Sequence, residues 1–250
     1  MKILGIIPAR YASTRFPGKP LVDINGKSMI MRVFEQASKA FETVFVATDH
    51  SKIFDHVTSF GGKIIMTSAL HTSGTDRCAE ASILISDKLN TKFDIVVNIQ
   101  GDEPFINPLQ LELLVSCFEN ADTQISTLVK IITNAEDIWD SNKPKVVLDK
   151  NNKAIYFSRS PIPFLRNVPN NEWITKGIFY KHIGLYAYRS DILQEITKLP
   201  FSALEKAESL EQLRWIENGY NIAAKITDIE SFPIDTPDDL EKIKLYFKQA

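Results

Sequence analysis

A loop that carries three cations and no acid follows the first apolar stretch of the sequence. Residues 9–20 read ARYASTRFPGKP, and Met1–Val22 contains no Asp or Glu. The polar side chains of this loop include Arg10, Ser13, Arg15 and Lys19. Guanidinium forks and an ammonium can neutralise several oxygens of a polyphosphate, while backbone N–H groups beside a glycine approach them closely. Because a merely solvated basic loop normally has acids interspersed, the pattern favours phosphate binding.

This loop matches neither of the two commonest nucleotide-binding motifs. The Walker pattern requires a glycine five residues before Gly18 and a Ser or Thr after the lysine. The sequence has Ser13 and Pro20 at those places, and no GxGxxG stretch occurs anywhere in it. A P-loop NTPase is therefore excluded, and the usual dinucleotide-binding fingerprint is missing.

Two aspartates are candidate metal ligands. Asp102 lies in QGDEP, directly after the apolar run DIVVNI, and Asp235 lies in PIDTP before the last predicted helix. Each has an ordinary explanation, because Gly-Asp makes turns and residues around Thr236 cap helices. Mg²⁺, however, usually takes one or two carboxylates together with phosphate oxygens and water. Combined with the basic loop, the pair predicts a Mg²⁺ site.

The elements that must position these residues alternate between strand and helix. Short apolar runs predict strands at 2–8, 43–47, 63–66, 94–99 and 125–131, and helical periodicity predicts helices at 29–37, 53–60, 76–89 and 108–118. Such alternation predicts an α/β fold with a mostly parallel sheet, in which ligands bind beyond the carboxyl ends of the strands. The basic loop and the QGDEP segment both follow predicted strands.

The alternation breaks in the second half of the sequence. Asp149-Lys150-Asn151-Asn152 separates two short apolar runs, 145–148 and 154–157, and predicts a hairpin. We therefore expect an inserted β-rich subdomain at about 133–190. A capping box of Ser202 and Glu205 predicts a helix running to about Asn218, and Thr236-Pro237 predicts the start of the last helix.

Composition restricts the possible partners and the compartment. The chain has 250 residues, a net charge of -2 and a pI of about 6.1, which lacks the basic excess that general nucleic-acid binding requires. Cys78 and Cys117 cannot build a disulfide framework and show no CxxC spacing. The N-terminal apolar run is too short for a signal peptide, and no window resembles a membrane span. We expect a cytoplasmic protein that binds neither nucleic acid nor membrane.

The motifs taken together resemble one family. IIPARYASTRFPGKPL, VATDH, SGTDR, VNIQGDEP, KVVLD, YFSRSPIP, HIGLYAYR, LEQLRW and IDTPDDLE occur in this order and span nearly the whole chain. They closely resemble the 3-deoxy-manno-octulosonate (Kdo) cytidylyltransferase family. The resemblance implies a Rossmann-like sheet of the nucleotide-diphospho-sugar transferase type, one domain over residues 1–250 with the inserted subdomain used for dimerisation, and a homodimer. It also implies transfer of the cytidylyl group of CTP to the anomeric hydroxyl of Kdo, for lipopolysaccharide synthesis, with Mg²⁺ as cofactor.

The resemblance also assigns roles to residues. The catalytic set would be Arg10, Lys19, Asp102 and Asp235, of which the two aspartates would hold the metal. CTP would be bound by Arg10, Ser13, Arg15, Lys19 and Arg77, the last on the cytosine side. The sugar would be bound by Gln100, Arg159, His182, Tyr186, Glu211 and Gln212.

Alternatives remain at this point. The sugar-site residues could equally be ordinary core, interface or solvated side chains. The segment Phe164-Leu165-Arg166-Asn167 and Asp76 depart from the family pattern, and the former lies beside Arg159. The acceptor could therefore be 8-amino-Kdo or another α-keto sugar acid. A non-catalytic nucleotide-binding protein of the same fold should lack a metal carboxylate, whereas this sequence has both aspartates.

Overall fold

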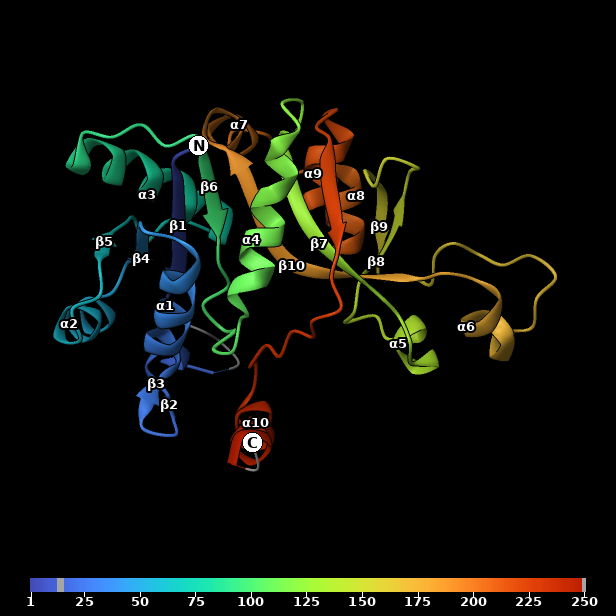
Figure 1. Ribbon diagram of the computed structural model, residues 1–250, viewed down its shortest axis with the longest axis horizontal. Helices are drawn as coiled ribbons and strands as arrows, with labels where there is room; N and C mark the ends of the chain where they lie inside the picture. The colour runs from blue at the N-terminus through green and yellow to red at the C-terminus, as the bar shows by residue number, and fades with distance from the viewer. Residues whose placement is uncertain (13–15, 249–250) are drawn as a thin grey trace. The chain divides into compact units, whose positions relative to one another are not determined.

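A computed structural model describes residues 1–12 and 16–248 (Figure 1). The chain divides into two units. Unit 1 consists of Met1–Glu112 and Ser231–Ala250, and unit 2 consists of Leu113–Glu230. The predicted subdomain at about 133–190 lies within unit 2. Its separate status, and the treatment of 1–250 as a single domain, stay predictions. None of the helices in the described ranges is both long and apolar enough to cross a membrane.

Unit 1 contains four parallel strands. β1 (Ile3–Ala9) pairs with β4 (Val44–Thr48) on one side and β6 (Ile95–Asn98) on the other, and β4 pairs with β5 (Ile64–Met66). Almost every side chain of β1, β4 and β6 is buried, as expected for parallel strands covered on both faces. The predicted α/β fold with a mostly parallel sheet is confirmed.

Three helices connect these strands. The chain moves outward from β1 through α1 (Met29–Ala40) and α2 (Ser51–Ser59), then returns through α3 (Gly74–Leu89) to β6 beside β1. The side chains of Ser28 and Ser73 cap α1 and α3 by accepting hydrogen bonds from backbone N–H groups. The strand order therefore reverses between β1 and β6, the place where open α/β sheets bind ligands.

A short hairpin and the C-terminal helix complete unit 1. β2 (Asp23–Ile24) and β3 (Lys27–Ser28) follow a 3₁₀ turn, η1 (Lys19–Leu21), and are joined through Asn25 and Gly26, both at positive φ. This hairpin was not predicted from the sequence, although Asn-Gly is a strong hairpin signal. α10 (Pro237–Lys248) packs through Leu240 onto Ile24 of the hairpin.

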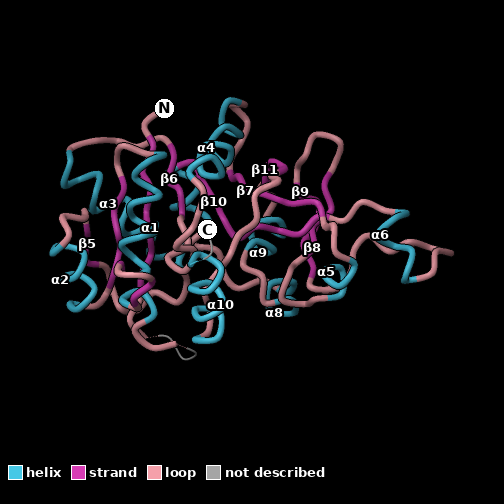
Figure 2. The backbone as a smooth tube through the Cα atoms, turned by 60° about the horizontal axis from the view of Figure 1, so that its bottom comes forward, coloured by secondary structure: helices cyan, strands magenta, loops and turns pink. Residues whose placement is uncertain are grey.

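Unit 2 is richer in antiparallel pairing. β7 (Ile125–Ile131) lies between β11 (Ile222–Ile226), which is parallel to it, and β10 (Tyr180–Arg189), which is antiparallel. β8 (Lys145–Leu148) pairs with β10 and forms the predicted hairpin with β9 (Ala154–Ser158) (Figure 2). The shorter elements are η2 (Cys117–Glu119), α5 (Ala135–Trp139), η3 (Asn170–Glu172), α6 (Trp173–Lys176) and α7 (Ser190–Ile196). α4 (Pro108–Ser116) spans the boundary between the units.

The helix predicted from Ser202 to about Asn218 is two helices. α8 (Ala203–Glu208) begins with the expected capping box, and α9 (Gln212–Glu217) follows after a break. Ser209 has a φ of 51°, in the left-handed region, which ends α8. The prediction of one continuous helix was wrong, because the apolar spacing continues across the break.

Candidate active site

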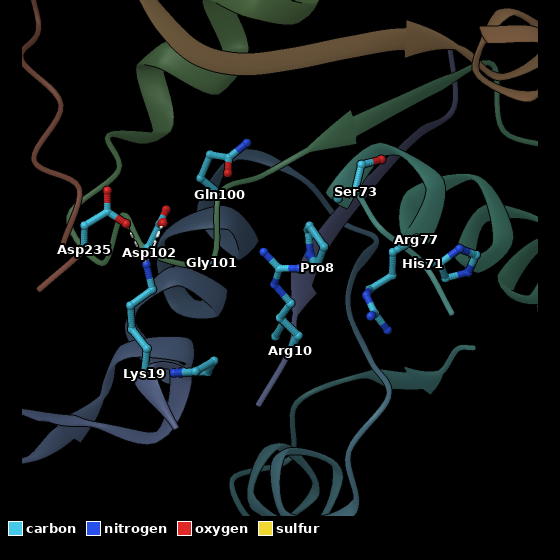
Figure 3. A pocket seen from close by; sticks show the side chains of 13 residues that line it. Pro8, Arg10, Lys19, His71, Ser73, Arg77, Gln100, Gly101, Asp102 and Asp235 are labelled. Atoms are coloured by element: carbon cyan, nitrogen blue, oxygen red, sulfur yellow. Dashed lines mark hydrogen bonds and ion pairs between the residues drawn. The ribbon is translucent and has the colours of Figure 1, made fainter. Parts of the chain in front are cut away.

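A cavity of about 220 Å³ lies in unit 1 at the carboxyl ends of β1 and β6 (Figure 3). The residues that line it are Pro8, Ala9, Arg10, Lys19, Pro20, His71, Ser73, Gly74, Arg77, Gln100, Gly101, Asp102 and Asp235. Figure 3 shows Lys19 and the two aspartates on one side, His71 and Arg77 on the other, and Arg10 between them. The cavity thus occupies the place that the strand order predicts for a ligand.

Close packing between two strand ends brings these loops together. Pro8 belongs to β1, and Gly101 follows β6. A Cβ atom on Gly101 would lie 3.0 Å from the carbonyl oxygen of Pro8, so any other residue would push the two loops apart. The glycine therefore allows Asp102 and Arg10 to line the same cavity.

Lys19 is bound to both candidate metal ligands. Its Nζ donates to Oδ2 of Asp102 at 2.8 Å and to Oδ1 of Asp235 at 3.2 Å. The lysine side chain is 15% exposed, against 27% for Asp102 and 39% for Asp235. The first 22 residues contain no acid, so the partners of Lys19 come from segments distant in sequence.

Backbone contacts fix where the two aspartates lie. The backbone N–H of Ile234 donates to the carbonyl of Asp102 at 2.9 Å, and Ile234 is fully buried against Met29. The N–H of Asp235 donates to the carboxylate of Asp239 in the first turn of α10. The segment after β6 thus holds Asp102 in place, and the first turn of α10 holds Asp235.

The donor set suits a divalent cation that prefers oxygen. Both carboxylates already share one cation, so their oxygens face a common point. Mg²⁺ can be held by two carboxylates when phosphate oxygens or water fill its other positions. In the described part of the chain, no group of three or more His, Cys, Asp or Glu side chains could hold a metal. The pair therefore fits a cation that arrives with phosphate oxygens.

Glu103 is a buried carboxyl next to Asp102. It is 6% exposed, and the hydroxyl of Ser231 donates to its Oε2 at 3.2 Å. Burial, reinforced by the charge of Asp102, raises the pKa of Glu103 to about 7. Glu103 therefore carries a proton over part of the neutral pH range.

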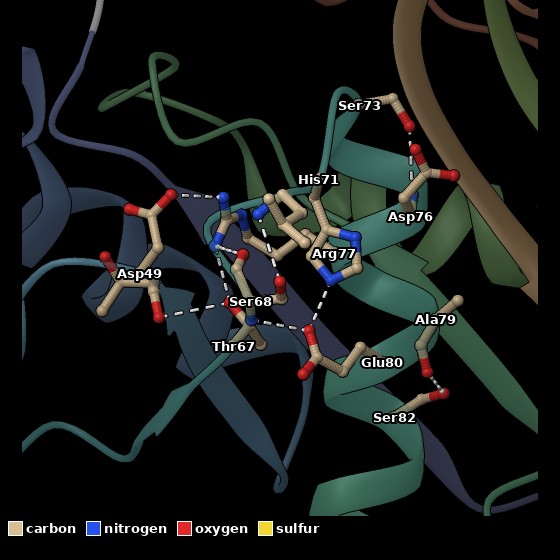
Figure 4. Close-up of polar contacts among 12 residues, drawn as sticks. Asp49, Thr67, Ser68, His71, Ser73, Asp76, Arg77, Ala79, Glu80 and Ser82 are labelled. Carbon is tan, nitrogen blue, oxygen red and sulfur yellow. Dashed lines mark hydrogen bonds and ion pairs between the residues drawn. The ribbon is translucent and has the colours of Figure 1, made fainter.

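The opposite wall of the cavity contains a buried, fully oriented arginine (Figure 4). Arg77 is 3% exposed, and its Nη2 donates to Oδ2 of Asp49 at 2.7 Å. Its Nη1 donates to the hydroxyl of Thr67 at 2.6 Å and to the carbonyl of Ser68 at 3.4 Å. These bonds hold the guanidinium in one plane, as recognition of a flat ligand group requires.

His71 and Glu80 extend this wall. The Nε2 of His71 is hydrogen-bonded to Oε2 of Glu80, which also accepts the backbone N–H of Ser68 at 2.8 Å. Desolvation raises the pKa of Glu80, but the hydrogen bonds from Ser68 and His71 outweigh it, so the pKa lies below its usual value. The sequence did not predict a role for His71, Ser73 or Glu80, although all three follow the predicted strand at 63–66.

The structure describes only some of the residues that were predicted to bind phosphate from the basic loop. Arg10 lines the cavity, whereas Ser13 and Arg15 lie outside the described residues. The neighbouring Tyr11 stacks on His50 with 4.2 Å between ring centroids, and its carbonyl accepts the N–H of Gly18 at 3.0 Å. These contacts hold both ends of the loop.

The predicted sugar-site residues of unit 2 lie mostly around β10 and α9. The imidazole of His182 contacts the hydroxyl of Thr127 at 3.0 Å, and its ring centroid lies 5.3 Å from that of Tyr186. Burial lowers the pKa of His182 to about 3, so the ring is neutral. The hydroxyl of Tyr186 and Nε2 of Gln212 are buried without a hydrogen-bond partner in the described structure. Such atoms are costly unless a ligand satisfies them.

Comparisons with known proteins decide the family. A family model described as Cytidylyltransferase matches residues 4–243. The chain is 57% identical over 246 residues to a 3-deoxy-manno-octulosonate cytidylyltransferase of Parabacteroides distasonis, covering 97% of this chain and 96% of the relative. It is 56% identical over 251 residues to a protein of that name from Bacteroides thetaiotaomicron, covering 99% of both.

The chain belongs to the cytidylyltransferase family. A solved structure of a CMP:2-keto-3-deoxy-manno-octonic acid synthetase complexed with CTP matches it with a TM-score of 0.89 and 43% identity, over 100% of this chain and 99% of that one. The resemblance found in the sequence is therefore confirmed, and the protein is a nucleotidyltransferase.

One residue that the cytidylyltransferase resemblance places in the sugar site has a different set of partners in the structure. The guanidinium of Arg159 donates to the carbonyls of Ser141, Glu208 and Ser209, at 2.9, 2.6 and 3.2 Å. It thus binds the C-terminal end of α8. Gln100 lines the cavity of unit 1, and Glu211 precedes α9, where its charge contributes to raising the pKa of Tyr186, after burial and Tyr188.

Proposed function

We propose that this protein transfers the cytidylyl group of CTP to the anomeric hydroxyl of 3-deoxy-manno-octulosonate and releases pyrophosphate. The proposal rests on relatives that are named for this reaction and are 56–57% identical to this chain over nearly its full length. The cavity at the carboxyl ends of β1 and β6 supports it, because Lys19 and a pair of carboxylates line one side and Arg10 lies beside them. We also propose a cytoplasmic homodimer that supplies the activated sugar for lipopolysaccharide synthesis.

CTP binds in the cavity of unit 1 with its phosphates toward Arg10 and Lys19. These cations can donate to several phosphate oxygens and neutralise them. Ser13 and Arg15 would assist from the same loop. The base then lies toward Arg77 and His71, at the other side of the cavity (Figure 3).

Asp102 and Asp235 would hold Mg²⁺. The bound cation supplies neutralisation of phosphate charge and acidification of a hydroxyl near it. The chain contributes two carboxylates that are oriented by β6 and by the start of α10. Their contacts with Lys19 support a role on the side of the cavity where we propose that the phosphates bind.

Unit 2 supplies most of the groups that bind the sugar acid, and Gln100 of unit 1 is added to them. Tyr186 and Gln212 present buried polar atoms that sugar hydroxyls could satisfy, and His182, Glu211, Arg159 and Gln100 complete the proposed set. A neutral His182 can donate or accept a hydrogen bond but does not serve as a general base, because its pKa of about 3 makes it a weak one.

The reaction is an in-line displacement. The anomeric hydroxyl gives up its proton to solvent as its oxygen forms a bond to the α-phosphorus of CTP, the bond between that phosphorus and the bridging oxygen breaks, and pyrophosphate leaves. Such transfers depend mainly on positioning and charge stabilisation. Arg10 and Lys19 can supply both.

A matrix of nucleotides and sugar acids tests the proposal. Pyrophosphate release would be measured with CTP, UTP, ATP and GTP, each with Kdo, with 8-amino-Kdo and without sugar. We expect release with CTP that depends on Kdo, and weak release with the purine nucleotides. Equal rates with all nucleotides would contradict CTP transfer. Preference for the amino sugar by more than about tenfold would assign it as the acceptor instead.

A further inference from the structure

We propose that Lys19 occupies the divalent-cation position between Asp102 and Asp235 when no nucleotide is bound, so that the position opens only after nucleotide phosphates draw the ammonium away. This inference rests on the proposed function, which places a divalent cation at these carboxylates. It gives binding an order, because the cation position becomes available once the nucleotide phosphates are bound.

The contacts of the lysine carry the inference. One Nζ atom donates to both carboxylates, at 2.8 and 3.2 Å, and therefore stands at their common point. The lysine side chain is largely withdrawn from water at 15% exposure. A cation that entered the nucleotide-free site would have to displace the ammonium and leave it without these two charged partners, which is costly for a charge largely withdrawn from water.

The backbone beside Lys19 is fixed, but its side chain can move. Gly18 has a φ of 70°, and its N–H donates to the carbonyl of Tyr11 while its own carbonyl accepts the N–H of Leu21 at 2.9 Å. These bonds hold the Cα of Lys19 beside the cavity. The flexible four-carbon stem lets the ammonium exchange one set of anionic partners for another. Phosphate oxygens bound at Arg10 would be such a set.

The exchange changes the charge at the carboxylates. With Lys19 present, one ammonium offsets part of the negative charge of both carboxylates. Once the ammonium has turned to the phosphates, this contribution is lost to the carboxylates, and a divalent cation can restore it. Nucleotide and cation therefore raise each other's affinity, as linkage requires.

Binding of Mn²⁺ to the nucleotide-free protein tests the inference. Free Mn²⁺ would be measured by its paramagnetic resonance signal during titration of the wild-type protein and of Lys19→Met, which keeps most of the apolar stem. We expect the variant to bind one Mn²⁺ about tenfold or more tightly than the wild type, equivalent to about 1.4 kcal/mol. Adding Asp102→Asn to the variant should remove the gain.

A matched variant separates displacement from a general charge effect. Arg10→Met removes one positive charge from the same cavity, but Arg10 forms no ion pair with either carboxylate among the described contacts. We expect it to change Mn²⁺ affinity by less than about threefold. Equal gains in Arg10→Met and Lys19→Met, or no gain in Lys19→Met, would overturn the inference.

Two further measurements keep the test decisive. Lys19→Gln repeats it if the methionine variant does not fold, as judged by circular dichroism. Cytidylyl transfer by the wild type is measured separately. If the wild type transfers the cytidylyl group but Lys19→Met gains no Mn²⁺ affinity, only this inference fails. If the affinity rises but the wild type transfers nothing, only the proposed function fails.

Discussion

Lys19 has two sets of possible partners, carboxylates in the nucleotide-free protein and phosphates in the proposed complex. Replacing it with methionine removes a charge that would be aimed at the transferring phosphoryl group. By analogy with the loss of one preorganised donor, we expect kcat to fall by roughly 10²- to 10³-fold. Steady-state pyrophosphate release measures this. Near-normal turnover in a folded Lys19→Met protein would remove Lys19 from the mechanism.

The two aspartates should act as one unit. Either Asp102→Asn or Asp235→Asn is expected to abolish most activity, because a shared cation loses one of its two carboxylates. An asparagine oxygen can still accept from Lys19, so the melting temperature without ligands should change little. The double variant should be about as inactive as the worse single variant. A multiplicative loss in the double variant would show that the aspartates act independently.

Glu103 should make stability depend on pH. Its pKa is about 7 in the folded protein and near 4.5 when unfolded, so between these values only the folded state keeps the proton. The free energy of unfolding should therefore fall as pH rises from about 4.5 to 7, by up to about 3 kcal/mol from this group.

Glu103→Gln provides the comparison for that pH dependence. The amide cannot titrate, and its oxygen can still accept from Ser231. Urea denaturation at several pH values should give curves for the two proteins that converge toward pH 4.5 and separate toward pH 7, with the variant more stable. Parallel curves for wild type and variant would contradict the burial argument.

At the residue scale, residue types in the sequence predicted several groups that line the cavity, but they did not predict which side chains contact one another. The acid-free loop and Asp102 each follow a predicted strand, and Asp235 precedes the last predicted helix; all three contribute residues to one cavity. The ion pairs of Lys19 could not be predicted, because its partners lie far away in the sequence. Asp102 is 83 positions from Lys19, and Asp235 is 216 positions from it. Asp49 and Glu80 were missed because each appears as an ordinary surface acid until the fold brings it to Arg77 or His71.

Two residues of the predicted sugar site, Gln212 and Arg159, are associated with the break between α8 and α9 in different ways. Gln212 opens α9 with a buried amide nitrogen that has no hydrogen-bond partner in the described structure. Gln212→Leu should therefore keep or raise stability while it impairs use of the sugar, because the apolar side chain removes an unsatisfied polar atom. Arg159→Ala should instead lower stability by about 1 to 3 kcal/mol, because three carbonyls lose their donor.

Two measurements distinguish these roles. Urea denaturation gives stability, and calorimetry of CTP binding together with the KM for Kdo locates the functional defect. Both variants should leave CTP affinity nearly unchanged. If Gln212→Leu destabilised the protein as much as Arg159→Ala did, Gln212 would be a structural residue.

At the element scale, regular periodicity made the strands and long helices of unit 1 predictable. The continuous apolar spacing of Leu204, Leu210 and Leu213 concealed the break at Ser209, since nothing in that spacing marks a left-handed residue. The Asn25-Gly26 hairpin carried a readable turn signal, but its strands of two residues are too short for a periodic pattern.

For the whole molecule, we propose that unit 1 binds the nucleotide and that unit 2 supplies most of the sugar-binding groups. Attack on the α-phosphorus determines the two products. A ³¹P nuclear magnetic resonance spectrum of the protein with CTP, Mg²⁺ and Kdo tests this attack most directly. We predict that pyrophosphate and a CMP phosphodiester appear in equal amounts as CTP disappears, and only when Kdo is present. Formation of CDP and inorganic phosphate, or loss of CTP without Kdo, would contradict it.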